Sequence, residues 1–542
     1  MRDIHHPFDD LFFCYFDSDQ KMTIRRRSSV RDASFEELYP TTDDDNDSIS
    51  SYQQQLRCSR TLNLRQNSKN SLNEIFTQIL PSASLEKSLL LNPIDQFDPN
   101  LSTQILQSGN EIEIMSLFDE IQIASNFSIS NTFPNSNQIN NSQLNSVSIN
   151  NSKNVGIQNS LTLLFESSSF LESLANCLVM SFSQALQVSL LQTISVIFPN
   201  TSLKEEFIDY GICMSLFDFI SSDYLMISMA SIQLIDLICE YSSYGRDAIV
   251  CLGLHTQMME IASKETDLNL TNACCVALQK LFCNPDFIDP SALIQCVKPL
   301  SNLLYLNSKV ALQAVVECFV EMTNKIPSLV YALFEIDDIV VYLINLLEDD
   351  ALTESALKLI GNMSMSQPSQ INLMLNRGII QKLLYFIGTS STRASESFWV
   401  LSNMVESVPQ MLIPFITQSF LDNVIQTAKD STIEVKKEAA FFISTVIIYS
   451  EDSTVPYFLQ YDVVDLLCEM LGCAVTIIVL RCLDTLMILL HFSINQAQTV
   501  FSSFMIDCDI IDRLSELVEE QTPMVTERAI YLLRQVDQAK QS

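Results

Sequence analysis

The stretch from Gly378 to Asn403, GIIQKLLYFIGTSSTRASESFWVLSN, contains every part of the pattern that determines the fold of this chain. A glycine is followed by a short apolar segment, a polar break and a second, longer apolar segment. Glycine tolerates the left-handed backbone conformation that a tight turn between helices needs. Apolar residues at positions i, i+3, i+4 and i+7 predict that both segments are amphipathic helices.

The same pattern recurs along the chain. A Gly or an Asp precedes a short apolar segment at Gly211, Asp338, Gly378, Asp462 and Asp509. Equivalent positions of the longer segments recur every 40 to 44 residues, at Leu191, Ile232, Val276, Glu317, Lys358, Trp399, Phe441 and Arg481. Armadillo and HEAT arrays have periods of about 40 to 47 residues. Because one amphipathic helix pair cannot bury its own apolar face, we expect stacked repeats to form the core.

The composition agrees with an all-α body, since the 542 residues include only 9 Gly and 16 Pro. We predict an all-α, armadillo-repeat superhelical solenoid over residues 160–538, preceded by a largely disordered N-terminal region. Residues 41–159 form a polar insert with too few apolar residues to offset the entropy of ordering. Within this insert, Ser71–Leu80 and Glu111–Ala124 have helical apolar spacing, which indicates isolated helices or an early repeat fragment.

The charge of the chain limits its partners. It has 31 Lys and Arg against 64 Asp and Glu, a formal net charge of -33. Such a charge repels nucleic acid and anionic lipid and attracts basic partners, so we expect neither a nucleic-acid nor a membrane partner. The most apolar long stretch, Ala474–Phe492, contains Arg481, Asp484 and His491, which are costly in a bilayer. Fifteen cysteines without a CxxC pair indicate buried thiols in a reducing compartment, among them Cys274 and Cys275.

No motif of a known catalytic or metal site stands out. The four histidines lack metal-ligand spacing, and the chain has neither a Gly-rich phosphate loop nor a GxSxG elbow. We therefore expect a protein that is not an enzyme and that uses no cofactor or metal.

Several segments of the later repeats resemble consecutive repeats of importin-alpha, a family of armadillo-repeat nuclear import adaptors. They are SALKLIGNMSMSQPSQINLMLNRGIIQKLLYFI from Ser355, ASESFWVLSNM from Ala394, EVKKEAAFFISTVI from Glu434, VLRCLDTLMILL from Val479 and DCDIIDRLSELVEEQTPMVTERAIYLL from Asp507. The resemblance extends over roughly the last two thirds of the chain and is clearest after Ala311. It implies that the protein binds basic nuclear localisation peptides of cargo proteins in a concave groove, and that it works in the cytoplasm and the nucleus.

The family's groove carries a Trp and, four residues later, an Asn on the long helix of successive repeats. Trp399 and Asn403 match this pair, with Ser402 beside the Asn and Glu396 one turn before the Trp. Residues i and i+4 share one helix face. An indole suits the stem and cation of Lys or Arg, and an Asn amide can hold both polar groups of an extended peptide backbone.

The neighbouring repeats extend this predicted site. The preceding repeat has Asn362 with Lys358 in place of Trp, and the following repeat has Phe441 with Glu438 one turn earlier. Together they resemble the family's second, minor peptide site. The predicted peptide-binding residues are Trp399, Asn403, Ser402, Asn362, Glu396, Glu438 and Phe441.

The earlier repeats depart from the Trp and Asn pattern. The corresponding pairs are Leu191/Ser195, Ile232/Asp236, Val276/Lys280 and Glu317/Glu321. Three acids in this set, Asp236, Glu317 and Glu321, leave the stretch acidic. We expect it to attract basic peptides with less geometric selectivity.

Residues 1–40 contain the basic run KMTIRRRSSVRDASFEEL. Its Arg25, Arg26, Arg27 and Arg31 resemble the importin-beta-binding segment of the family, a basic helix that also folds back onto the groove. Importin-beta is therefore an expected partner. A solvated charge run, or a kinase site at Ser28 or Ser29, is the alternative for this segment.

Two other functions remain open at this point. A non-transport armadillo scaffold would bind another extended protein segment, and the divergent first repeats favour it. A structural or regulatory subunit of a larger assembly would instead have stable partners. For Trp399 itself the alternative is a core position, because a lone Trp on an apolar helix is more often core than ligand site.

Overall fold

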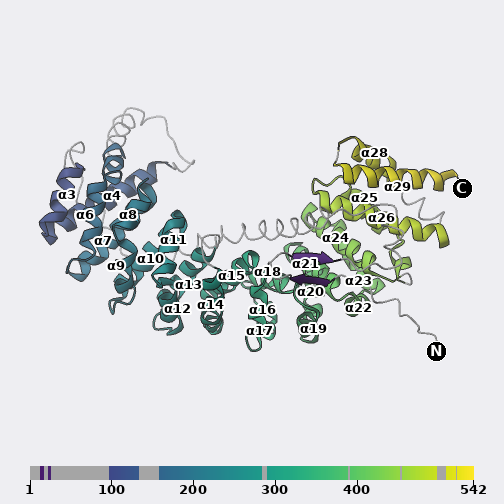
Figure 1. Cartoon of the computed structure of the whole chain (residues 1–542), viewed down its shortest axis with the longest axis horizontal. Coiled ribbons are helices and arrows are strands. Elements are labelled where there is room, and N and C mark those ends of the chain that lie inside the picture. Colours follow the sequence, from purple (N-terminus) through teal and green to yellow (C-terminus); the bar gives the residue numbers. More distant parts are fainter. Residues whose placement is uncertain are drawn as a thin grey trace, which may run out of the picture. The chain divides into compact units, whose positions relative to one another are not determined.

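The computed structural model describes residues 13–16, 22–25, 97–132, 158–283, 290–388, 391–451, 454–496, 508–520 and 522–541. Helices dominate these residues, so the predicted all-α repeat class is confirmed (Figure 1). The chain divides into two compact units. The first unit comprises Leu62–Leu329, and the second comprises Val330–Ser542 together with Met1–Thr61.

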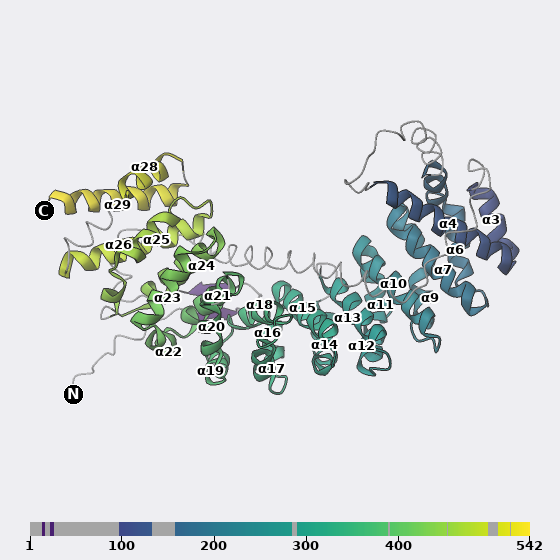
Figure 2. The same cartoon turned by 180° about the vertical axis from the view of Figure 1, so that it is seen from behind.

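The first unit is a stack of helical repeats (Figure 2). Its elements are α3 (Pro99–Ser108), α4 (Glu111–Thr132), α6 (Ser168–Cys177), α7 (Gln184–Ile197), η1 (Phe198–Asn200), α8 (Lys204–Asp209), α9 (Ile212–Phe219), α10 (Leu225–Tyr241), α11 (Ser243–Cys251), α12 (Leu254–Ser263), α13 (Leu268–Phe282), α14 (Pro290–Asn302), η3 (Leu303–Tyr305) and α15 (Lys309–Lys325). Two short helices precede each long helix in the repeats α8–α10 and α11–α13. The long helices α7, α10, α13 and α15 pack against one another in chain order.

The second unit repeats this arrangement. Its helices are α16 (Leu329–Phe334), α17 (Ile339–Leu346), α18 (Thr353–Met363), α19 (Pro368–Asn376), α20 (Ile379–Ile387), α21 (Ser391–Ser407), α22 (Pro409–Leu412), η4 (Ile413–Phe415), α23 (Gln418–Lys429), α24 (Ile433–Tyr449), η5 (Val455–Phe458), α25 (Tyr461–Met470), α26 (Thr476–Gln496), α28 (Ile510–Glu520) and α29 (Pro523–Gln541). The long helices α18, α21, α24, α26 and α29 pack in chain order. In both views α17 and α19 lie below α18 and α21.

Left-handed turn residues start most of the predicted short helices. Gly211, Asp338, Gly378 and Asp509 all have positive φ angles, between 53° and 95°, as the Gly or Asp pattern predicted. Asp462 differs, because it lies inside α25, which follows Gln460 in extended conformation. The short 3-10 helix η5 makes that connection instead. The pattern therefore identified the short helix but not its turn.

The helical array begins before residue 160, the start that the sequence predicted. Helix α4 includes Glu111–Ala124 and packs against α7, and α3 packs against α6. These contacts favour the early repeat fragment over isolated helices for Glu111–Ala124. The second predicted helix of the insert, Ser71–Leu80, lies outside the described residues.

Two short strands precede the helices. Strand β1 (Phe13–Phe16) pairs with β2 (Met22–Arg25) in antiparallel register, and Phe13 lies opposite Arg25. This hairpin is the only sheet among the described residues.

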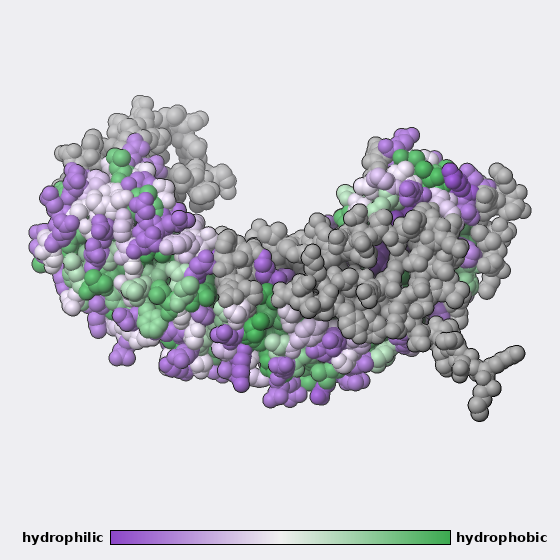
Figure 3. Space-filling view, viewed as in Figure 1, coloured by the Kyte–Doolittle hydropathy of each residue, from purple (hydrophilic) through white to green (hydrophobic). Residues whose placement is uncertain are grey.

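Apolar side chains between the helices form the core, which includes phenylalanines such as Phe319, Phe398 and Phe442. Cys274 and Cys275 are fully buried, as predicted, and burial raises the pKa of the Cys275 thiol to about 12. The short helices also expose single apolar residues, such as Met214 on α9. Figure 3 shows such residues scattered among polar ones on the visible face of the first unit.

A candidate peptide-binding row on the long helices

The seven predicted peptide-binding residues lie on three long helices of the second unit that pack in sequence. Asn362 lies on α18, Glu396, Trp399, Ser402 and Asn403 lie on α21, and Glu438 and Phe441 lie on α24. The repeat period places them at matching positions of successive helices. We call these residues the candidate row.

Trp399 and Asn403 both contact the preceding long helix at Gly361. A Cβ atom built on Gly361 would lie 1.8 Å from Cζ3 of the Trp399 ring, so the ring occupies the space that glycine leaves. The Asn403 side-chain amide donates a hydrogen bond to the Gly361 carbonyl, at 3.3 Å. Trp399 is 2% exposed and Asn403 is 4% exposed. The pair therefore joins α21 to α18, in addition to any role in binding.

Ser402 has a role within its own helix. Its hydroxyl donates to the Phe398 carbonyl at 2.8 Å, and the residue is fully buried. Thr445 on α24 repeats this arrangement, with its hydroxyl bonded to the Phe441 carbonyl at 2.8 Å. Such bonds to the carbonyl four residues earlier are common for Ser and Thr inside helices. The hydroxyl proton of Ser402 is thus used inside α21.

Phe441 stacks with a cation from the next long helix. The Arg481 guanidinium of α26 lies 5.2 Å from the centre of the Phe441 ring. The same guanidinium forms an ion pair of 2.7 Å with Glu406 of α21. The Arg481 and Glu406 side chains are 12% and 20% exposed. Sequence reasoning placed Arg481 in the repeat register but did not assign it a contact, and it missed Glu406.

Other charges on these helices also pair within the second unit. Glu396 and Glu438 of the candidate row are 6% and 4% exposed. Lys358, which takes the Trp position on α18, forms an ion pair of 2.7 Å with Glu354 one turn earlier. Arg528 of α29 pairs with Asp484 of α26, also at 2.7 Å. Ion pairs thus lie within α18 and between α26 and α29.

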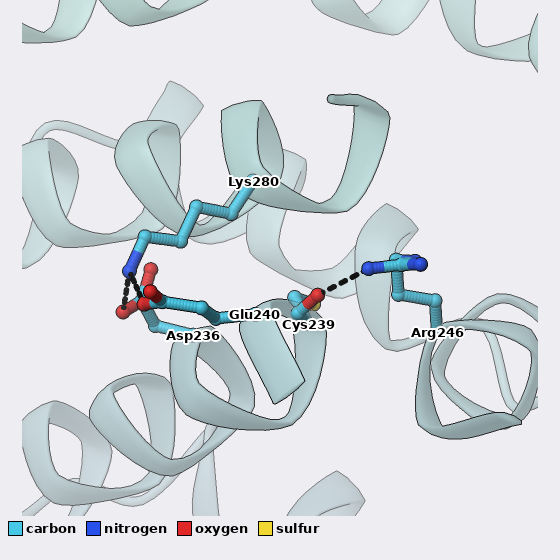
Figure 4. A network of polar contacts seen from close by, with 5 residues as sticks. All are labelled: Asp236, Cys239, Glu240, Arg246 and Lys280. Carbon is cyan, nitrogen blue, oxygen red and sulfur yellow. Dashed lines mark hydrogen bonds and ion pairs between the residues drawn. The ribbon is translucent and has the colours of Figure 1, made fainter. Parts of the chain in front are cut away.

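In the first unit, a lysine bridges Asp236, one of the three acids expected to attract basic peptides, and the nearby Glu240 (Figure 4). The Lys280 ammonium of α13 lies 2.6 Å from Asp236 and 2.8 Å from Glu240, both on α10. Burial by itself would lower the pKa of Lys280. The two carboxylates have the larger combined effect and hold this pKa above its usual value. Arg246 donates to the Cys239 carbonyl nearby, at 2.6 Å.

Of the two remaining acids of that stretch, Glu317 is bound by side-chain amides. Glu317 on α15 accepts hydrogen bonds from Gln279 and from Gln313. Glu317 and Glu321 are 2% and 5% exposed. The hydroxyl of Ser195, at the first predicted position, donates to the Leu191 carbonyl at 2.8 Å. The chain's own groups therefore contact Ser195, Asp236 and Glu317 among the predicted positions in the first unit.

Of the four arginines of the expected importin-beta segment, the described residues include Arg25. Arg25 ends strand β2 rather than lying on a helix. Arg26, Arg27 and Arg31 lie outside the described residues.

Among the described residues, no group of three or more His, Cys, Asp or Glu residues has an arrangement that could hold a metal ion. None of the described helices is both long enough and apolar enough to cross a bilayer. An open cavity of about 350 Å³ in the first unit lies between Ser202–Glu206 and Tyr241–Ser243.

Comparison with solved structures supports the helical fold. No family model matches the chain, and no curated protein does either. The crystal structure of an engineered protein from a structural genomics consortium is similar, with a TM-score of 0.59 and 16% identity over 81% of this chain and 98% of that chain. Two more engineered proteins each match 46% of this chain and 97% and 99% of their own, at TM-scores of 0.38 and 0.36 and identities of 16% and 17%.

Proposed function

We propose that this protein is an importin-alpha-like adaptor that binds basic nuclear localisation peptides along the candidate row. The observation that carries the proposal is the position of Asn362, Trp399, Asn403 and Glu438 on three long helices that pack in sequence. An amide, an indole and carboxylates at this spacing match the backbone and the cationic side chains of an extended Lys- and Arg-rich peptide.

Charge supports the same proposal. The net charge of -33 attracts basic peptides over a distance that depends on ionic strength. The contact of Arg481 with Phe441 and Glu406 is an internal example of the chemistry that a peptide arginine would use. In the full proposal, Arg25, Arg26, Arg27 and Arg31 bind importin-beta, and the protein moves between cytoplasm and nucleus.

The test is a binding titration of a fluorescently labelled peptide that carries one lysine and arginine cluster, followed by anisotropy. Wild type should bind it, and affinity should fall as salt rises. Trp399→Ala combined with Asn403→Ala should weaken binding by about tenfold to a hundredfold, because it removes the aromatic wall and the backbone amide contact together.

A matched control lies on the short helix α20, where Gln381 and Tyr385 also place an amide and an aromatic ring four residues apart. Both residues are exposed, Tyr385 by 63%. Gln381→Ala with Tyr385→Ala should leave peptide affinity unchanged. If wild type binds no basic peptide even at low salt, the proposal is wrong.

A non-transport scaffold that binds another extended segment is the second candidate. The bridge from Lys280 to Asp236 and Glu240 favours it, because an internal cation already contacts these acids in the first unit. The low exposure of Trp399 and Asn403 also favours it. A pull-down with residues 1–40 separates the two functions. Importin-beta among the retained proteins supports the adaptor, whereas its absence supports the scaffold.

A further inference from the structure

A cation of the chain covers the Phe441 ring of the candidate row. The Arg481 guanidinium lies 5.2 Å from the ring centre, within the range of a cation–π contact. A lysine or arginine of a bound peptide would use the same ring face. Arg481 and a peptide cation therefore compete for one position.

Arg481 is held at this position from a second side. Its ion pair with Glu406 is 2.7 Å long, and both side chains are largely buried. Charge-assisted hydrogen bonds of this kind are among the stronger ones in proteins. The three residues come from three different long helices, α21, α24 and α26, which pack in sequence. The arginine is thus fixed by the stacking of the repeats as well as by its own helix.

We infer that Arg481 is an internal ligand of Phe441 and Glu406, and that it ends the peptide site on the α26 side. Peptide cations then bind at Trp399 and are excluded from Phe441. Arg481 is in this sense a specificity-determining residue, because it sets how far a run of basic residues can extend along the row. This inference rests on the proposed function. It goes further, because it predicts the length of peptide that the site accepts.

Two other cations of the chain make comparable contacts. In the first unit Lys280 also pairs with Asp236, a carboxylate at a predicted peptide position, so internal cations at such positions occur more than once. On α21, Arg393 lies 5.5 Å from the centre of the Phe386 ring and 2.7 Å from Asp350. Arg393 makes the same two kinds of contact as Arg481, but its ring belongs to the short helix α20. It offers a matched control.

The experiment compares three labelled peptides that share a lysine cluster. One has the cluster alone, and the other two add an arginine pair beyond a short neutral spacer, at the N-terminal or the C-terminal side. Wild type, Arg481→Gln, Arg481→Lys and Arg393→Gln are each titrated with all three. The readout is the ratio of the Kd of the short peptide to the Kd of each extended peptide.

For one of the two extended peptides, the ratio of Kd values should be about fivefold to twentyfold higher in Arg481→Gln than in wild type. The extended peptide thus gains affinity when Arg481 no longer covers the ring. Arg481→Lys should give a smaller gain in affinity, because a guanidinium is planar and stacks on an aromatic ring, so an ammonium replaces it only in part. Arg393→Gln should keep the wild-type ratio. Combining Phe441→Leu with Arg481→Gln should remove most of the gain.

Each result bears on the inference. If wild type binds the short peptide and Arg481→Gln shows the wild-type ratio for both extensions, the inference is wrong while the proposed function stands. If neither wild type nor any variant binds any of the peptides, both are wrong. Circular dichroism checks folding, and if Arg481→Gln does not fold, Arg481→Lys decides, with an unchanged ratio counting against the inference.

Discussion

At the scale of single residues, Gly361 controls the environment of the only tryptophan in the chain. A glycine inside a helix costs about 1 kcal/mol relative to alanine, so its presence in α18 needs a packing reason. The reason is the Trp399 ring, which lies where a Cβ atom would be. Asn403 bonds to the carbonyl of the same glycine. The contacts of Trp399 and Asn403 with α18 thus depend on the absence of a side chain at Gly361.

Gly361→Ala should lower the free energy of unfolding by about 1 to 3 kcal/mol, because the added methyl overlaps a ring that must shift or turn. Since the chain has 1 Trp, tryptophan emission reports on this position alone. Emission should move to longer wavelength as the ring leaves its buried place. Chemical denaturation and a fluorescence spectrum measure both effects.

Gly388→Ala is the matched control for that substitution. Gly388 follows α20 with a φ of -87°, and the nearest atom to an added Cβ is 3.9 Å away. The change should be neutral or stabilising by less than about 1 kcal/mol, with unchanged emission. Equal stability and emission for Gly361→Ala and wild type would contradict the packing described for Trp399.

At the scale of helices, the turn before each short helix differs between repeats that look alike in sequence. DIVVYLINLL from Asp338 and DVVDLLCEML from Asp462 share the same first residue and apolar spacing. Asp338 has a φ of 53°, in the left-handed region, whereas Asp462 lies within helix α25. Glycine is favoured in the first setting and disfavoured in the second.

The substitution Asp338→Gly should therefore stabilise the protein by about 0.5 to 1 kcal/mol, because it relieves a left-handed residue that carries a Cβ. Its exposed pair with Arg377, at 3.8 Å, contributes little. Asp462→Gly should instead destabilise by about 1 kcal/mol or more, as it adds glycine to a helix and removes the contact with Lys429, at 2.5 Å. Urea denaturation of the pair checks the sign. The same sign for both would contradict the two backbone conformations.

At the scale of the whole molecule, the net charge of -33 opposes the compact state. Cations between successive repeats offset part of this repulsion locally. Lys382 pairs with Glu348 and Lys436 with Glu469, both at 2.7 Å and both across about one repeat. Exposed pairs of this kind contribute up to about 1 kcal/mol each.

Raising NaCl from about 10 mM to about 150 mM should therefore raise the Tm by a few degrees, because the screening length falls from about 30 Å to about 8 Å. Screening then weakens long-range repulsion more than it weakens partly buried contacts such as Arg481 with Glu406. Differential scanning calorimetry over a salt series measures this. A Tm that falls with salt would show that local attraction outweighs repulsion.

The sequence by itself determined the helices and their repetition. Apolar spacing and a period near 41 residues are properties of the chain that hold wherever each helix packs. They placed Trp399, Asn403, Asn362 and Phe441 at matching positions of successive long helices, as observed. The peptide that these residues are proposed to bind remains a prediction.

Only the tertiary structure decided what those side chains contact within the chain. Trp399 with Gly361, Arg481 with Phe441 and Glu406, and Lys280 with Asp236 each join residues about one or two repeats apart. Such contacts depend on how closely two helices stack and on which rotamer each side chain adopts. The period of apolar residues predicts which face of each helix is buried. It predicts neither the distance between neighbouring helices nor the rotamer of a side chain.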